Sequence, residues 1–232
     1  MDRADAERIL ASAGWLSRQP VSFQNALFRQ GYLVNFAKGE YLYRIGDAAG
    51  GIYGLLEGGF AAEVMVGRSL SRVAHVLRRY NWIGTGPALS GQTRVFTFRA
   101  IEPGSALHLP IAGVNKLRTE DPSAIQRIGA LAEENMKLAI HVVSDLLIRS
   151  TDRRISAALL RISGASVADP SPPPHEVMMT QSELGEIANA SRDVVSRLLK
   201  RMQTQGWVEL GYNRIRIVDA DALQSFTYDG VD

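Results

Sequence analysis

The hydrophobic pattern changes twice along the first half of the chain. Apolar residues in the first 30 positions recur at helical spacing, as in Ile9, Leu10 and Leu16, which predicts N-terminal helices. From residue 34 to 109 the pattern changes to short β-branched and aromatic runs broken by glycines. Strands of about four to seven residues at roughly ten-residue spacing predict an antiparallel barrel or sandwich. The candidate strands are 41–43, 52–56, 60–66, 72–77, 95–100 and 106–109.

Residues 122–148 predict one long helix, because they contain a single glycine and no proline after the first position. A seam at coiled-coil spacing comprises Ile125, Ile128, Ala132, Ala139, Val142 and Leu146, with Asn135 in the missing place. A second apolar face comprises Leu131, Leu138, Ile140, Val143 and Leu147. Two apolar faces need two partners, so we expect one to pack on its own domain and the other on a twin helix in a homodimer. Asn135 either sets the register of that pair or faces solvent.

Residues 163–174 read SGASVADPSPPP and have no apolar period. Proline disfavours helix, so this segment predicts a loop, either as an insertion within one domain or as a domain linker.

Residues 180–206 predict two short helices joined by a turn. Thr180 and Glu183 have the spacing of a capping box, which starts the first helix. Ser191 is a suitable N-cap for a second helix over 192–205, and Gly206 is suited to end it. Two helices about a short turn form a helix-turn-helix. Residues 207–217 add a predicted hairpin, which makes the module a winged helix.

The second helix of this module has two distinct faces. Its predicted docking side comprises Val195, Leu198, Leu199 and Met202, and its free side comprises Arg192, Asp193, Ser196, Arg197 and Lys200. Arginine pairs with guanine, aspartate accepts from cytosine and serine suits either, so the first two turns predict base contacts in the major groove of DNA. Ser191 and the helix N-terminus predict a phosphate contact. Lys200, with Arg201, Arg214 and Arg216, either contacts phosphates or keeps the surface soluble.

Composition narrows the functional classes. The chain is 46% hydrophobic and 22% charged with a net charge of +2, as in an ordinary globular protein. It has no cysteine, which excludes disulfides, thiolate zinc sites and cysteine-ligated iron–sulfur clusters. The four histidines are too far apart in sequence for a compact metal motif, so we expect no metal site. No apolar run is long enough to span a membrane and the first residues lack a signal pattern, which predicts a cytoplasmic protein.

Catalysis is not expected, because the chain has no G-x-S-x-G, H-E-x-x-H, Walker A or G-x-G-x-x-G motif. The alternative to a DNA-binding regulator is a metabolite-sensing β module that acts through protein contacts.

Several motifs resemble those of the cyclic-AMP receptor protein and fumarate–nitrate regulator (Crp/Fnr) family of bacterial transcription factors. Residues 38–47 are similar to K-G-E-x-L-x-x-x-G-D at the start of the family's β-roll. Residues 52–58 resemble its next strand and turn, and residues 82–84 its aromatic-x-G motif. Residues 191–200, SRDVVSRLLK, are similar to its recognition helix. The resemblance covers about residues 20–225, nearly the whole chain.

This resemblance implies an α+β fold with three parts. These are a cyclic-nucleotide-binding-like jelly roll at 1–120, a long dimerisation helix at 121–150 and a winged helix-turn-helix at 151–232. It makes Arg192, Asp193, Ser196 and Arg197 the base-reading residues, with Asp193 in place of the usual glutamate. It implies a homodimer on a pseudo-palindrome whose half-sites lie about 34–36 Å apart, and RNA polymerase as a candidate partner.

The ligand residues of the family are only partly present. Gly84 and Thr85 stand where cyclic-AMP-binding members have glycine and the glutamate for the ribose, and Val95 replaces the hydroxyl residue that follows Arg94. Arg94 is therefore either a phosphate-binding residue or a surface arginine. These changes argue against cyclic AMP and leave another anion, a hydrophobic effector or no ligand. Haem would have to use His75 or His141, and a lone histidine is more often a packed residue, so we do not expect haem.

Overall fold

The protein is described by a computed structural model that covers residues 1–166 and 175–229. The chain divides into two compact units, each described here by itself. The first comprises Met1–Ser71 and Val76–Leu138, and the second comprises Arg72–His75 and Ala139–Asp232. Most of the predicted proline-rich loop, residues 167–174, lies outside the described residues.

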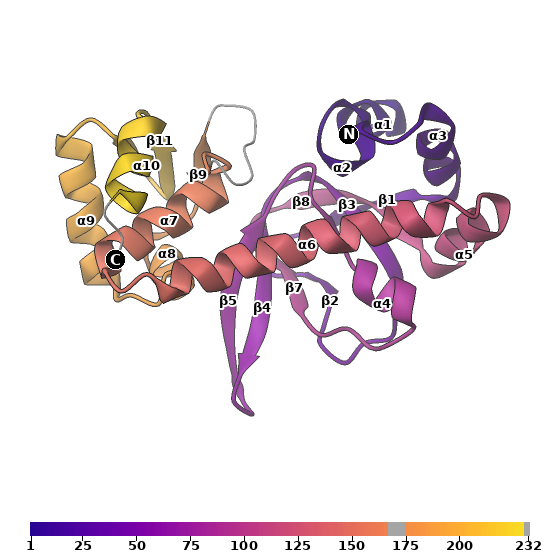
Figure 1. Cartoon of the computed structure of the whole chain (residues 1–232), viewed down its shortest axis with the longest axis horizontal. Helices are drawn as coiled ribbons and strands as arrows, with labels where there is room; N and C mark the ends of the chain where they lie inside the picture. Colours follow the sequence, from indigo (N-terminus) through magenta and orange to yellow (C-terminus); the bar gives the residue numbers. More distant parts are fainter. Residues whose placement is uncertain (167–174, 230–232) are drawn as a thin grey trace. The chain divides into compact units, whose positions relative to one another are not determined.

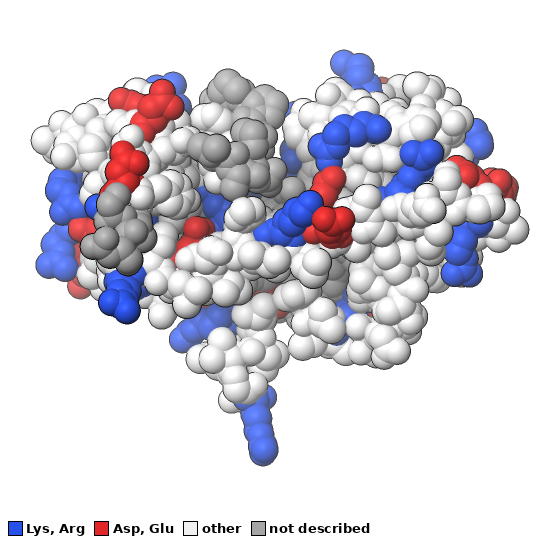
Figure 2. Space-filling model, viewed as in Figure 1, with Lys and Arg blue, Asp and Glu red and all other residues white. Residues whose placement is uncertain are grey.

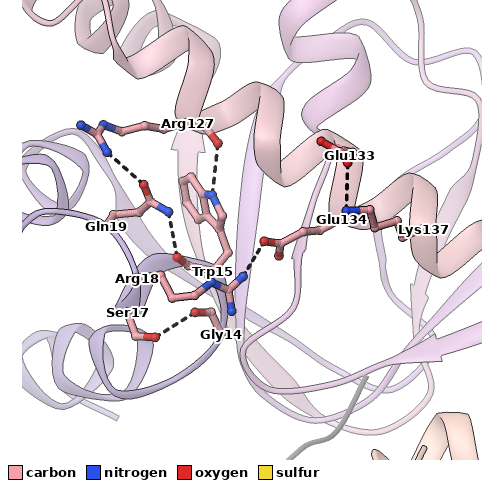
Figure 3. A network of polar contacts seen from close by, with 9 residues as sticks. All are labelled: Gly14, Trp15, Ser17, Arg18, Gln19, Arg127, Glu133, Glu134 and Lys137. Carbon is pink, nitrogen blue, oxygen red and sulfur yellow. Dashed lines mark hydrogen bonds and ion pairs between the residues drawn. The ribbon is translucent and has the colours of Figure 1, made fainter. Parts of the chain in front are cut away.

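The first unit begins with the predicted helices, α1 (Arg3–Ser12), α2 (Gly14–Ser17) and α3 (Val21–Gln30), which lie beside β1, β3 and β8 (Figure 1). Polar contacts join this group to the long helix, as Figure 3 shows. Nε1 of Trp15 donates to the carbonyl of Arg127 at 3.1 Å, and Arg18 pairs with Glu134 at 2.5 Å. The N-terminal helices are thus held to the long helix by specific bonds as well as by apolar packing.

Eight strands of the chain form two four-stranded sheets, which confirms the predicted antiparallel β-roll. The first sheet has the order β1 (Tyr32–Phe36), β8 (Gly104–Pro110), β3 (Gly51–Glu57) and β6 (Trp82–Ile83). The second has the order β2 (Tyr41–Tyr43), β7 (Thr97–Ala100), β4 (Phe60–Val66) and β5 (Leu70–Leu77). The predicted strand 95–100 begins later than expected, since Val95 and Phe96 precede β7 and are exposed.

Close packing explains one glycine in the first sheet. A Cβ on Gly54 would lie 2.6 Å from the ring of Trp82, too near for any side chain. Trp82 is buried and packs edge-on against Trp15, with ring centroids 5.4 Å apart. Glycine at position 54 therefore leaves room for the indole of Trp82 in the core.

Three helices follow the β-roll strands or interrupt them: α4 (Thr85–Ser90), α5 (Ile111–Glu120) and α6 (Ala124–Leu147). The long helix α6 does have two faces, but they differ from the predicted ones. The face buried in its own chain comprises Ala124, Ile128, Leu131, Val142 and Asp145, with Asn135 and Leu138 half-buried. The exposed apolar face, called the α6 stripe below, comprises Ile125, Met136, Ile140, Val143, Leu146 and Leu147. The predicted seam wrongly combined members of both.

The second unit contains the predicted winged helix, whose helices and strands follow each other as expected. Its helices are α7 (Thr151–Ser163), α8 (Gln181–Ile187), α9 (Arg192–Thr204) and α10 (Ala220–Tyr228). Its antiparallel sheet has the order β10 (Val208–Gly211), β11 (Arg214–Ile217) and β9 (Glu176–Met178). The hairpin β10–β11 forms the wing, and α7 packs against both helices of the helix-turn-helix.

Candidate nucleic-acid interface

The first helix of the helix-turn-helix starts at the predicted capping box. The amide of Glu183 donates to Oγ1 of Thr180 at 3.1 Å, and the amide of Thr180 donates to Oε2 of Glu183 at 2.7 Å. Two N-terminal amides that lack helical partners are satisfied in this way. The local sequence alone therefore fixes where α8 begins.

A tight turn then joins α8 to α9. The amide of Ala190 donates to the carbonyl of Gly185 at 2.8 Å, which closes the turn on the helix before it. A Cβ at Gly185 would lie 2.7 Å from the carbonyl oxygen of Ala190, so only glycine allows this approach. Asn189 adopts a left-handed conformation with φ 48°, which asparagine tolerates better than most residues. These residues set the angle at which α9 leaves the turn.

Arg154 on α7 donates hydrogen bonds to the same turn. Sequence analysis did not identify this role. Nε of Arg154 donates to the carbonyl of Ala188 at 2.7 Å and its Nη2 to that of Asn189 at 3.3 Å. Its Nη1 donates to the carbonyl of Ile148 at 2.8 Å. One guanidinium thus satisfies carbonyls at the end of α8 and just after α6.

The predicted docking side of α9 is buried, as expected: Val195, Leu198, Leu199 and Met202 all lie in the core. Ser191 is the N-cap and accepts from the amide of Val194 at 3.4 Å. The opposite side is free, with Arg192, Asp193, Arg197 and Lys200 exposed and Ser196 half-buried. The structure therefore places the six predicted DNA-binding residues on one accessible surface, called the α9 face below.

The basic residues of the α9 face differ from neighbouring basic residues in their ion pairing. Arg201 pairs with Asp152 at 2.7 Å, Arg214 with Glu176 at 3.7 Å, and Arg216 with Glu209. No ion pair within the described ranges engages Arg192, Arg197 or Lys200. Lys and Arg side chains gather at the edge that carries α9 in Figure 2. Unpaired guanidinium and ammonium groups keep all their donors available for an external anion or base edge.

Residues 84–86 and 94–96, called the cassette below, lie in the first unit, and Arg94 is not a surface residue. Its side chain is 2% exposed, with Nη2 donating to the carbonyl of Gly51 at 2.7 Å and Nη1 to that of Gly84 at 3.1 Å. The guanidinium carbon also lies 4.0 Å from the ring centroid of Tyr43. Gly84 has φ 91°, and a Cβ there would meet Nη1 of Arg94 at 2.5 Å. The arginine is therefore built into the β-roll.

Thr85 and Asn135 meet in this structure, which corrects the expected role of the asparagine. Nδ2 of Asn135 donates to the carbonyl of Trp82 at 3.0 Å and to Oγ1 of the buried Thr85 at 3.3 Å. Asn135 therefore neither faces solvent nor sits in the α6 stripe. Its amide instead fixes α6 on the cassette of its own chain.

The aromatic side chains around Arg94 include the buried Tyr43 and His108. Burial raises the pKa of Tyr43, although the Arg94 guanidinium partly opposes this shift. Burial also lowers the pKa of His108, whose ring stacks on Tyr53 with centroids 4.2 Å apart. The neutral forms of these side chains are thus favoured, and Arg94 is the cation among them.

The described residues contain no cluster of three or more His, Asp or Glu side chains that could hold a metal ion. Nδ1 of His75, one of the two histidines considered for haem, lies 2.5 Å from Nη1 of Arg161, and His141 is half-buried. None of the helices in the described part of the chain is long and apolar enough to cross a bilayer.

Two family models match the chain at the two places just described. Residues 33–121 match the model described as cyclic nucleotide-binding domain, and residues 153–226 match the Crp-like helix-turn-helix domain. Together these ranges cover more than half of the chain. They coincide with the β-roll carrying the cassette and with the winged helix carrying the α9 face.

Curated proteins and solved structures agree with the models. The chain is 23% identical over 164 residues to the cAMP-activated global transcriptional regulator CRP of Escherichia coli O6:H1, covering 70% of this chain and 78% of that one. It is 22% identical over 231 residues to the CRP-like cAMP-activated global transcriptional regulator of Mycobacterium tuberculosis, covering 94% and 97%. The structure of FixK2 from Bradyrhizobium japonicum aligns with a TM-score of 0.70 at 16% identity, covering 84% and 96%. With a cyclic nucleotide-binding domain followed by a Crp-like helix-turn-helix, the chain belongs to the Crp/Fnr family, whose members are transcription regulators and not enzymes.

Proposed function

We propose that this regulator binds duplex DNA as a homodimer, with one α9 in the major groove of each half-site of a pseudo-palindromic operator. The observation that carries the proposal is the α9 face, where exposed cations form no ion pair with any described residue while the opposite side of the helix is buried. Arg192 and Arg197 are suited to paired contacts with guanine O6 and N7. Asp193 is suited to accept from cytosine N4, and Ser196 to either a donor or an acceptor.

Two residues of the α9 face are assigned to the DNA backbone. The oxygen of Ser191 caps α9, and its hydroxyl hydrogen remains able to donate to a phosphate. The flexible ammonium of Lys200 provides a point charge rather than a planar fork, which suits phosphate better than a base edge. These contacts would position the protein, whereas the four residues nearer the helix start would read sequence.

The homodimer is proposed from the α6 stripe. Its six large apolar side chains are exposed in the single chain, and their helical spacing suits packing against a parallel twin helix. A symmetric pair presents two copies of α9, which requires half-sites about 34–36 Å apart. In this arrangement residues 1–120 form the sensor domain, residues 121–150 the dimerisation helix and residues 151–232 the DNA-binding domain. RNA polymerase is the proposed protein partner.

The relatives named above are described as cAMP-activated, but we infer that the cassette of this chain is not suited to cyclic AMP. Both Nη groups of Arg94 are engaged by carbonyls of the β-roll, and only its Nε lacks an acceptor within the described residues. Thr85 is buried and engaged by Asn135, and it offers no carboxylate to a ribose hydroxyl. We propose that the β-roll domain responds to an effector other than cyclic AMP or holds its conformation without one.

Selection of bound duplexes from a random pool, followed by titration at several salt concentrations, tests the proposal. We expect a pseudo-palindromic consensus and a log–log salt slope of about −0.9 for each phosphate contact neutralised. A selection that returns no consensus, together with binding that does not change with salt, would contradict the proposal. It would favour a β-roll module that acts through protein contacts.

A further inference from the structure

Arg154 donates to two parts of the second unit that lie far apart in the sequence. On the α6 side, its Nη1 donates to the carbonyl of Ile148 at 2.8 Å and to that of Arg149 at 3.5 Å. On the helix-turn-helix side, its Nε donates to the carbonyl of Ala188 at 2.7 Å and its Nη2 to that of Asn189 at 3.3 Å. One side chain of α7 therefore joins the end of the long helix to the turn that precedes α9.

The guanidinium of Arg154 uses its donors inside the protein. A further hydrogen bond runs from its Nη2 to Oγ1 of Thr151 at 3.3 Å. Its five hydrogen bonds equal in number the N–H donors of an arginine side chain. The exposed cations of the α9 face, by contrast, are free to meet a phosphate or a base. Arg154 is therefore suited to a role within the protein rather than to a contact with DNA.

The planar guanidinium restricts where its acceptors can lie. Its N–H groups point in fixed directions within one plane, so the carbonyls on its two sides are held in one relative position. The link between α6 and α7 comprises only residues 148–150. A second bond crosses this link, because Nε of Arg161 on α7 donates to Oδ2 of Asp145 on α6 at 2.7 Å. The last turns of α6 are thus tied to the helix-turn-helix.

The second unit also contains part of the proposed dimer interface. The members of the α6 stripe that belong to it are Ile140, Val143, Leu146 and Leu147. The α9 face belongs to the same unit. When these four side chains pack at the twofold axis of a dimer, the distance and the angle from that axis to α9 are set inside this unit. Two symmetric copies then fix the spacing of the half-sites that they contact.

We propose, on the basis of the function proposed above, that Arg154 is a positioning residue that fixes α9 relative to the dimer axis and so makes the regulator selective for the spacing between two half-sites. One base pair more or less moves the half-sites by about 3.4 Å and rotates them by about 35° around the duplex. While Arg154 holds the turn, α9 can follow such a change only if hydrogen bonds break. A loosened turn allows α9 to adjust.

Operators with altered spacing test this role in the full-length chain. The duplexes are the operator obtained by random-pool selection and two forms of it, with the half-sites one base pair closer together or further apart. The readout is the ratio of the Kd for a shifted operator to the Kd for the selected one. A variant that is merely less stable loses affinity for all three duplexes by the same factor, which leaves the ratio unchanged. For the unmodified protein we expect a ratio of about ten, equivalent to one or two net hydrogen bonds.

Arg154→Lys keeps the charge but replaces the planar fork by a single nitrogen. Its ratio is expected to fall from about ten to about two, because one ammonium cannot hold both sides of the turn. Arg153→Lys is the matched control, since Nη1 of Arg153 donates to the carbonyl of Asp229 at 2.6 Å and not to the turn. This control should keep the ratio of the unmodified protein.

The proposal is overturned if the unmodified protein binds all three duplexes alike, a measurement that does not depend on the stability of any variant. It is also overturned if Arg154→Lys keeps the full ratio, or if Arg153→Lys lowers it equally. In these cases the operator is still bound, so the proposed function stands. A failure of the unmodified chain to bind any duplex overturns the proposed function and the role of Arg154 together.

Discussion

Asn135 on α6 donates a hydrogen bond from Nδ2 to Oγ1 of Thr85, the first residue of α4, at 3.3 Å. The same amide group donates to the carbonyl of Trp82 at 3.0 Å, so a single side chain of the long helix joins β6 to the start of α4. Residues 82 and 85 flank the left-handed Gly84, whose carbonyl accepts from Arg94. The cassette and α6 are thus coupled by direct protein contacts.

Replacing Asn135 by alanine is expected to lower the free energy of unfolding by about 1–3 kcal/mol, because two polar groups in the interior lose their donor. Urea denaturation followed by tryptophan fluorescence measures this change, since Trp15 and Trp82 lie in the affected core. Lys137→Ala is the control, since Lys137 is exposed and its pair with Glu133 lies on the surface. Equal losses in both variants would show that the bonds of Asn135 contribute nothing beyond helix propensity.

Arg94→Ala separates a structural role from a ligand-binding role. If Arg94 mainly holds the carbonyls of Gly51 and Gly84, its removal is expected to destabilise the ligand-free protein by about 3 kcal/mol. A cation kept for a ligand would instead be neutral or unfavourable in the free protein, because buried charge costs free energy. Thermal unfolding of the purified variant, with the exposed Gln92→Ala as control, measures whether the substitution lowers or raises the stability of the ligand-free protein. A more stable Arg94→Ala would refute the structural role.

If α9 reads bases, substitutions of its neighbouring basic residues should weaken DNA binding in different ways. Arg192→Ala and Arg197→Ala are each expected to weaken binding to the selected operator by about 1–3 kcal/mol and to relax preference at one base pair. Lys200→Ala is expected to weaken all duplexes alike and to reduce the magnitude of the salt slope by about one phosphate contact. Fluorescence anisotropy with the operator and single-base variants measures both effects.

Gln203→Ala is the control for these substitutions, since Gln203 is exposed on the same helix but lies near its C-terminal end. It should bind as the unmodified protein does. If Arg192→Ala or Arg197→Ala keeps full discrimination between operator variants, the corresponding base contact is wrongly assigned.

The α6 stripe predicts the oligomeric state. Val143→Asp places a charge in the centre of the exposed apolar face and is expected to convert the dimer into monomers, with loss of operator binding at the same concentration. Ser144→Asp adds the same charge at the neighbouring exposed position outside the stripe and should leave the dimer intact. Sedimentation velocity of both variants distinguishes them. Dimers that persist in Val143→Asp would place the interface elsewhere.

Local signals in the sequence identified most of the winged helix. The capping box at Thr180 and Glu183, the N-cap Ser191 and the left-handed Gly206 each act within a few residues, so their effects are visible in the sequence. Heptad spacing likewise showed that α6 has two apolar faces. It did not assign the residues to the two faces correctly, because both faces repeat at nearly the same period and only tertiary contacts separate them.

Long-range contacts account for what the sequence did not reveal. Arg154 reaches carbonyls 34 and 35 residues away, and no local motif marks an arginine for that role. Arg94 is similar, since its carbonyl partner on Gly51 is 43 residues away. A surface position was one of the two alternatives for Arg94, since charged residues are usually exposed, and its burial arose from the fold around it.

Acidification is expected to destabilise the β-roll through His108. Nε2 of His108 lies 3.1 Å from the carbonyl of Gly50, which can only accept, and Nδ1 lies 2.8 Å from the hydroxyl of Tyr32. Nε2 therefore donates to the Gly50 carbonyl, and in the neutral ring Nδ1 accepts from the Tyr32 hydroxyl. Burial lowers the pKa of His108; the Gly50 carbonyl opposes this shift and the charge on Arg94 adds to it.

Because the pKa of His108 is lower in the folded chain than in the unfolded one, the unfolded chain binds the proton more readily. The free energy of unfolding should therefore fall as the pH drops below about 6.5, the ordinary histidine pKa. Urea denaturation of the unmodified protein and of His108→Gln, at pH 7.5 and 5.5, measures this contribution. Glutamine cannot titrate, so the variant is expected to lose less stability than the unmodified protein over the same interval. Equal losses would assign the acid sensitivity to other groups.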